Sequence, residues 1–213
     1  MNVLVWEEIQ TYFHENASVF WGNLFSHIQL SLAAIGAALI LCVPLGIWIS
    51  RKLSIADYII NGINMFRVVP SLAILALAMP LLGVGFIPAL LALTVLACPP
   101  IIINTYVAFR EIDAGIKEAA KGMGMTALQT VLKVEFPLAL PVMLAGVRTA
   151  SVEVIASATL AVLIGGNGLG SYIINGVSMM SKSFLLIGAV PVALLAIISE
   201  FVFAYIQKRL SYY

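Results

Sequence analysis

The stretch EAAKGMGMTALQTVLKVEFP, residues 118–137, interrupts a chain that is otherwise strongly apolar. It brings charges, two closely spaced glycines and a proline together, although the 213-residue chain is 62% hydrophobic and only 10% charged. A soluble domain carries about a quarter charged residues, so this composition indicates an integral membrane protein. The polar stretch is therefore expected to leave the bilayer.

The region around this stretch predicts two short helices with a glycine joint between them. Asp113 is placed to cap a helix that begins at Ala114, and Gly122 and Gly124 are expected to end that helix. Small side chains keep the helix thin, which suits insertion into a groove of another protein.

The second short helix is expected to start at Thr126, because Gln129 three residues later completes a capping-box pattern. Pro137 is expected to end it and lead into the next apolar run. On the residues alone, segment 110–137 is either a hairpin lying passively on lipid or a docking element for a cytoplasmic partner. Its acidic residues balance its lysines, which favours docking.

Five apolar runs are long enough to cross a membrane as helices, since each crossing needs about 20 residues. They cover residues 26–49, 58–82, 86–108, 138–164 and 184–206. With the N-terminus outside, only Lys182 of the eleven Lys and Arg residues lies outside, as the positive-inside rule favours. The predicted fold is therefore all-α. It is one membrane domain, residues 1–213, with five spans, a cytoplasmic C-terminus and a cytoplasmic loop at 110–137.

Prolines recur in or beside these runs. Eight of them are Pro44, Pro70, Pro80, Pro88, Pro99, Pro100, Pro141 and Pro191. Proline lacks a backbone donor and bends or breaks a helix. Membrane helices tolerate single prolines, but so many favour bent helices around a cavity that opens and closes.

Two segments are expected at the outer surface. Residues 5–13 predict a short amphipathic helix at the interface, with Trp6, Tyr12 and Phe13 as anchors. The glycine-rich stretch 165–183 predicts an outer loop with an amphipathic helix, either as a flexible turn or as an outer gate and docking rim.

The sequence lacks familiar catalytic and metal-binding patterns. It has no Gly-x-x-x-x-Gly-Lys-Ser/Thr loop, so the chain is not expected to hydrolyse ATP. Cys42 and Cys98 lack metal-ligand spacing and are expected to be small packing residues. His27, at a span entrance, is expected to be an interface residue. No catalytic residue, metal or cofactor is predicted.

Segment 118–137 resembles the EAA loop of type I ABC importer permeases, and the likeness extends over nearly the whole chain. That motif has Glu-Ala-Ala, three residues, Gly, nine residues, Ile, any residue and Leu-Pro; here Val134 and Phe136 stand for the Ile and Leu. The resemblance implies that the first short helix couples the membrane part to a cytoplasmic ATP-hydrolysing subunit, which binds ATP and magnesium. The implied coupling residues are Glu118, Ala119, Ala120, Gly122, Gly124 and Pro137.

Two further stretches resemble the glycine betaine, carnitine and choline permease group, which imports compatible solutes under osmotic stress. They are FRVVPSLAILALAMPLLGVG, residues 66–85, and RTASVEVIASATLAVLIGGNGLG, residues 148–170. The related methionine permeases share the five-span plan and remain an alternative. The resemblance implies a multi-pass protein of a bacterial cell membrane, with a second permease subunit, cytoplasmic ATPase subunits, an external solute-binding protein and no nucleic acid.

Charged residues inside spans are the informative ones, because each costs about 2.5–3.5 kcal/mol at a helix centre. Arg67 and Arg148 are expected to snorkel towards the cytoplasm. Glu153 is expected to pair with an arginine, with contact to the solute as the alternative, and Glu200 is expected to be structural. The residues predicted to line the path are Asn64, Ser71, Ser151, Glu153, Ser157 and Thr159.

Two other classes of protein are alternatives to an ATP-driven importer. A secondary transporter driven by an ion gradient predicts inverted repeats, and no internal repeat is evident. A membrane scaffold that uses segment 110–137 as a generic docking site is the third interpretation.

Overall fold

The fold is a bundle of helices in the computed structural model, which describes residues 2–211. No strand occurs within that range. The elements are α1 (Asn2–Ser50), α2 (Leu53–Phe66), α3 (Ser71–Leu82), α4 (Phe86–Arg110), α5 (Ala114–Gly122), α6 (Ala127–Thr130), the π-helix η1 (Val131–Glu135), α7 (Phe136–Ser157), the 3-10 helix η2 (Leu160–Ile164), α8 (Gly170–Ser178) and α9 (Lys182–Leu210).

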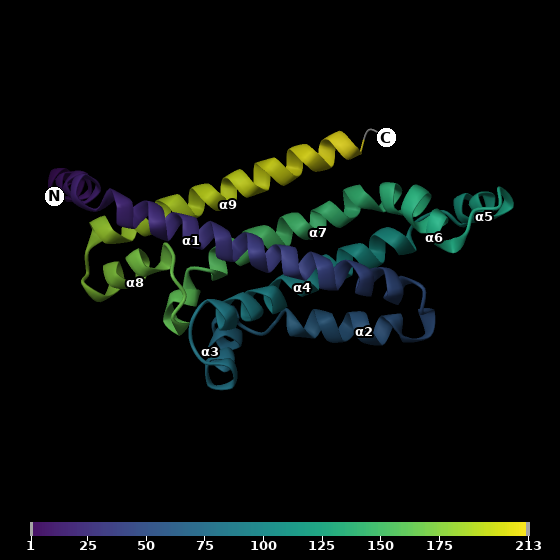
Figure 1. The fold of residues 1–213 in the computed structure, drawn as a ribbon, viewed down its shortest axis with the longest axis horizontal. Coiled ribbons are helices and arrows are strands. Elements are labelled where there is room, and N and C mark those ends of the chain that lie inside the picture. Colours follow the sequence, from purple (N-terminus) through teal and green to yellow (C-terminus); the bar gives the residue numbers. More distant parts are fainter. Residues whose placement is uncertain (1, 212–213) are drawn as a thin grey trace.

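The bundle is elongated, and its two ends differ (Figure 1). The N-terminus and α8 lie at one end, and α5 and α6 extend beyond the other helices at the opposite end. The described end of α9 points towards the α5 end. Since α1 and α9 begin at the α8 end and finish towards the α5 end, the two chain ends lie on opposite sides of the bundle.

Four helical segments within residues 2–211 are long and apolar enough to span a membrane. They are Val5–Ser50, Phe86–Arg110, Ala127–Ser157 and Lys182–Leu210. A fifth span exists only if α2 and α3 are counted together, and these two helices meet at an angle of 92°. The structure therefore supports four or five spans.

The span expected over residues 58–82 is broken in the structure, because α2 stops at Phe66 and α3 starts at Ser71. Pro70 precedes α3 and has extended backbone angles (φ −59°, ψ 136°). Proline also disfavours the helical conformation in the residue before it, so Val69 cannot easily continue α2. The break is filled by two turn hydrogen bonds, from Val68 N to Met65 O and from Val69 N to Phe66 O.

The N-terminal amphipathic helix and the first span both lie within α1, on either side of a kink. The backbone bends at Asn16, which has non-helical angles (φ −126°, ψ 23°). Figure 1 shows the segment before the bend turned away from the rest of α1. The helix itself is thus confirmed, and its place at a lipid interface stays a prediction.

Helix α4 lies at the centre of the bundle and packs against both α1 and α7, while α7 packs against α9. Glycines allow the closest approaches. A Cβ on Gly46 of α1 would lie 2.7 Å from Thr105 Cβ, and a Cβ on Gly146 of α7 would lie 2.5 Å from the Pro100 carbonyl oxygen. Cys42 is fully buried on the α1 side of this core, which confirms its packing role.

Candidate functional site

The first short helix of the polar segment forms as predicted. The Asp113 carboxylate accepts hydrogen bonds from the backbone N–H of Gly115 (2.7 Å) and Ile116 (3.3 Å), which caps the start of α5. The helix ends at Gly122, and Gly124 takes a left-handed conformation with φ +76°. Only glycine adopts this conformation without strain, so Gly124 sets the angle at which the chain leaves α5.

The second short helix begins with the predicted capping box. Gln129 N–H donates to Thr126 Oγ1 at 3.3 Å, and Thr126 N–H donates to Gln129 Oε1 at 2.9 Å. Both otherwise unsatisfied donors at this helix start are therefore paired. The joint between α5 and α6 is fixed on each side by a local side-chain cap.

The prediction that Pro137 ends the second helix is wrong. The chain stays helical from Ala127 to Ser157, by way of the π-helix Val131–Glu135 and then α7. Pro137 is the second residue of α7. Because proline cannot donate a hydrogen bond and its ring crowds the preceding turn, a wider π-turn is a suitable structure just before it. Residues 127–157 therefore form one continuous helical rod that leads from α6 into the bundle.

The protruding tip, residues 111–126, exposes much of the surface implied for coupling. Glu118, Ala119, Gly122 and Gly124 are exposed, whereas Ala120 is buried against the rest of the segment. Pro137 is exposed at the base of the segment.

Apolar side chains are exposed on and beside the tip. They are Ile116, Met123, Leu128 and Leu132, with exposed fractions of 40%, 73%, 68% and 58%. Exposed apolar side chains that gather at a protruding end mark an interaction surface.

A buried ion pair anchors the polar segment, and sequence reasoning missed it. Glu135 in the π-helix is almost fully buried and pairs with Arg51, which follows the end of α1. Glu135 lies four residues before the buried Ala139, on the inward face of the rod. An acidic residue on an inward face requires a partner, and this is the signal that was available in the sequence. Lys117 adds a second tie by donating to the Phe109 carbonyl at 3.1 Å.

The residues predicted to line a path do not form one cluster. Asn64 is exposed on α2, and Ser71 is half-buried at the start of α3. Ser151 is fully buried and donates to the Val147 carbonyl at 2.7 Å. Ser157 is also buried, and Thr159 donates to the Ala156 carbonyl at 2.7 Å. The roles of these residues stay predictions.

The expected ion pair of Glu153 is wrong. Arg148 pairs with Glu200 on α9, which confirms the structural role expected of Glu200. Glu153 has no ion-pair partner in the described part of the chain. Arg51 and Arg148 pair with Glu135 and Glu200, and Glu153 lines a groove.

The groove lies between α7 and α9 and has a volume of about 720 Å³. Its α7 wall includes Thr149, Glu153 and Ala156, and its α9 wall includes Glu200 and Phe201. Glu153 is half-buried in it. Most of the wall is apolar or small, so the two carboxylates, of Glu153 and Glu200, are its strongest polar features.

At the other end of the bundle, His27 is buried and is not the interface residue that was expected. Its Nε2–H donates to the Ile155 carbonyl at 3.1 Å. A Cβ on Gly168 would lie 3.1 Å from His27 Nδ1, so the loop after η2 packs directly on the ring. His27 thus connects α1, the end of α7 and the glycine-rich loop.

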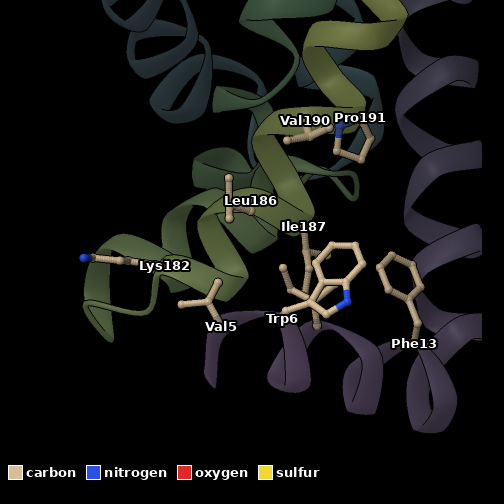
Figure 2. A pocket seen from close by; sticks show the side chains of 9 residues that line it. Val5, Trp6, Phe13, Lys182, Leu186, Ile187, Val190 and Pro191 are labelled. Atoms are coloured by element: carbon tan, nitrogen blue, oxygen red, sulfur yellow. The ribbon is translucent and has the colours of Figure 1, made fainter. Parts of the chain in front are cut away.

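The N-terminal part of α1 is tied to α8 and α9. The Tyr12 and Tyr172 hydroxyls share a hydrogen bond of 2.8 Å, and Ser183 donates to the Glu8 carboxylate at 2.5 Å. Figure 2 shows the adjoining pocket of about 560 Å³, where Trp6 and Phe13 face the start of α9. Its lining is apolar except for Lys182, so it offers little to a polar solute.

Residues 42–212 match the protein family described as binding-protein-dependent transport system inner membrane component. The chain belongs to this family. It is therefore a membrane permease subunit, and its several apolar helices agree with a multi-pass integral membrane protein.

The permease has relatives of similar length with known substrates. It is 40% identical to the carnitine transport permease protein OpuCB of Listeria monocytogenes, over 96% of this chain and 94% of the relative. It is 43% identical to the choline transport system permease protein OpuBB of Bacillus subtilis, over 88% and 86%. A glycine betaine/carnitine/choline permease of Bacillus subtilis is 38% identical over 96% and 94%.

The permease also resembles a solved structure. A chain of the inward-facing MetNI methionine ABC transporter superposes with a TM-score of 0.81 and 20% identity, over 90% of this chain and 95% of that one. At this identity the likeness shows the fold alone, which is that of a type I ABC importer permease.

Proposed function

We propose that this chain is the membrane-spanning permease subunit of an ATP-driven importer for glycine betaine, carnitine or choline. The observation that carries this proposal is the 38–43% identity to permeases named for these three solutes, over most of both chains. Import of such solutes protects a cell against osmotic stress. The chain itself is not an enzyme, since ATP and magnesium are bound by a separate subunit and this chain binds no cofactor.

The proposed orientation has the N-terminus outside and the C-terminus in the cytoplasm of a bacterial cell. The distribution of basic residues supports it, because Arg51, Lys121 and Arg209 then lie towards the cytoplasm and Lys182 is outside. In this orientation the tip enters the cytoplasm, and α8 faces the exterior. The whole chain, residues 1–213, acts as one permease domain with its coupling loop at 110–137.

The tip is the proposed contact for the ATPase subunit. The exposed Glu118, Ala119, Gly122 and Gly124 enter a groove on that subunit, and the buried Ala120 supports the helix from behind. Pro137 follows the π-turn through which motion reaches α7. The Asp113 cap and the Arg51–Glu135 pair support this role, because a rigid lever transmits displacement better than a loose loop.

Two further partners complete the proposed assembly. Five or fewer spans enclose little space, so a second permease subunit, identical or paralogous, supplies the other wall of the path. A solute-binding protein docks at the outer end formed by α8 and the glycine-rich loop. The proposed path residues are Asn64, Ser71, Ser151, Glu153, Ser157 and Thr159.

Uptake by proteoliposomes tests the proposal. The permease is reconstituted with its co-purifying ATPase subunit and an external binding protein, and entry of labelled glycine betaine, carnitine, choline and methionine is measured with and without internal ATP. We expect ATP-dependent uptake of at least one quaternary ammonium solute and none of methionine. Uptake of methionine alone would establish the methionine alternative. Uptake that needs an ion gradient and no ATP would make the chain a secondary transporter.

A further inference from the structure

The groove between α7 and α9 holds a carboxylate, that of Glu153, which forms no ion pair within the described residues. Glu200 is paired with Arg148, and no Lys, Arg or His within the described range forms an ion pair with Glu153. Arg67 acts on Glu153 through space without forming an ion pair. Because Glu200 is paired with Arg148, Glu153 is the one carboxylate that lines the groove without an ion-pair partner among the described residues.

The position of Glu153 favours a groove that does not face lipid. Thr149 and Ala156 lie one turn before and one turn after it, and both are exposed. Directing an ionised side chain at lipid costs about 2.5–3.5 kcal/mol on insertion scales. A half-buried glutamate between apolar neighbours therefore faces either water or another protein.

The size and lining of the groove suit a small organic cation. The small side chains of Thr149 and Ala156 leave a volume of about 720 Å³, which lies in the range of small-molecule sites. Phe201 lines the opposite wall and is 71% exposed, so its ring is free to contact a ligand. An aromatic ring and a carboxylate are the two groups that attract a quaternary ammonium ion, which cannot donate a hydrogen bond.

We propose that Glu153 and the Phe201 ring hold the ammonium group of the solute as it passes through a water-filled groove between α7 and α9. The inference rests on the proposed function, because that function supplies the quaternary ammonium solute. It adds a transient cation site within the permease to whatever selectivity the external binding protein provides. It also explains why Glu200 needs Arg148: an unpaired second carboxylate would hold the cation too tightly for release.

Cysteine labelling tests whether the groove is accessible to water and whether it attracts cations. In a variant with Cys42 and Cys98 replaced by alanine, Ala156→Cys is treated with a trimethylammonium methanethiosulfonate and with an anionic methanethiosulfonate. We expect faster modification by the cationic reagent and protection by choline. With Glu153→Gln added, we expect the preference for the cationic reagent to be lost, because the nearby negative charge that attracts it is gone. Phe201→Leu is expected to weaken the protection by choline and to leave the reagent ratio unchanged.

Val154→Cys is the matched control for Ala156→Cys, because Val154 lies two residues earlier on the same helix and is fully buried. It is expected to react with neither reagent. An unreactive Ala156→Cys would mean that the groove is closed by protein or lipid, and equal rates with both reagents would mean that Glu153 does not attract cations; either result overturns the proposal.

Uptake separates this inference from the proposed function. If the unmodified assembly imports no quaternary ammonium solute, the proposed function fails, whereas the labelling ratios still report the charge of the groove. If it imports choline, we expect Glu153→Gln to lose most of its choline uptake at saturating binding protein, with ATP hydrolysis retained. The charge-loss control is Glu15→Gln, since Glu15 is an exposed glutamate in the N-terminal part of α1, away from the groove. Unchanged choline uptake in Glu153→Gln overturns the inference alone.

Discussion

Glu135 lies in the π-turn that leads into α7, and its buried carboxylate pairs with Arg51 at the end of α1. The pair joins the first span to the base of the polar segment, across 84 residues of sequence. Only the acid is buried, since the Arg51 side chain is 41% exposed. Removal of Arg51 and removal of the Glu135 charge are therefore expected to have different effects on stability.

We predict that Arg51→Ala destabilises the permease more than Glu135→Gln. Removing the arginine leaves a buried, uncompensated carboxylate, which costs about 3–5 kcal/mol when the partner is fully buried and less here because Arg51 is partly exposed. Removing the charge of Glu135 leaves an arginine that water can solvate. Thermal unfolding in detergent compares the two variants, and the double variant Arg51→Leu/Glu135→Leu is expected to recover much of the loss. Equal melting temperatures for both single variants would contradict the asymmetry.

The left-handed backbone conformation of Gly124 supports a second prediction. A Cβ there meets nothing within 4 Å, so a substitution acts through backbone strain and not through a clash. We expect Gly124→Val to reorient α5, at a cost of about 1–2 kcal/mol, and to uncouple ATP hydrolysis from uptake while insertion in the membrane is normal. Gly124→Asn is the control, because asparagine tolerates this conformation. The ratio of solute imported to ATP hydrolysed is the measurement, and a normal ratio in Gly124→Val would count against the lever.

The local structure of the polar segment could be predicted from the sequence, because its caps are contacts between neighbours. Asp113 and the Thr126–Gln129 pair needed no information about the rest of the fold. The Arg51–Glu135 pair was missed because it joins residues far apart, and periodicity says which face a residue occupies but not what lies opposite.

The effects of single prolines were harder to predict. Pro70 breaks a predicted span, whereas Pro44 lies inside the continuous α1. Whether a helix accommodates a proline depends on how the helix packs and on the residues next to the proline. Pro137 is absorbed because a π-turn precedes it, and a π-turn has no simple sequence signal.

The start of α5 supports a third prediction. Asp113 caps two backbone donors, so Asp113→Ala is expected to cost about 0.5–2 kcal/mol of local helix stability. Because the tip is exposed, the loss is expected in local order and not in global unfolding. Hydrogen exchange of the α5 amides is the measurement, and Asp113→Asn is the control, since asparagine caps nearly as well. Equal exchange in Asp113→Ala and the parent chain would show that tertiary contacts alone hold the helix.

The contact between α1 and α4 gives the last prediction, with two glycines of one helix as a matched pair. A Cβ on Gly46 would lie 2.7 Å from Thr105 Cβ and 3.1 Å from the Ile102 carbonyl oxygen, whereas a Cβ on Gly36 meets nothing within 4 Å. Both positions are helical, so alanine gains a similar helix propensity at each, about 1 kcal/mol. At Gly46 the overpacking costs about 1–3 kcal/mol and outweighs that gain. Thermal unfolding in detergent is expected to show a lower melting temperature for Gly46→Ala and an equal or higher one for Gly36→Ala. If Gly46→Ala is as stable as Gly36→Ala, the two helices are not held at this distance by the glycine.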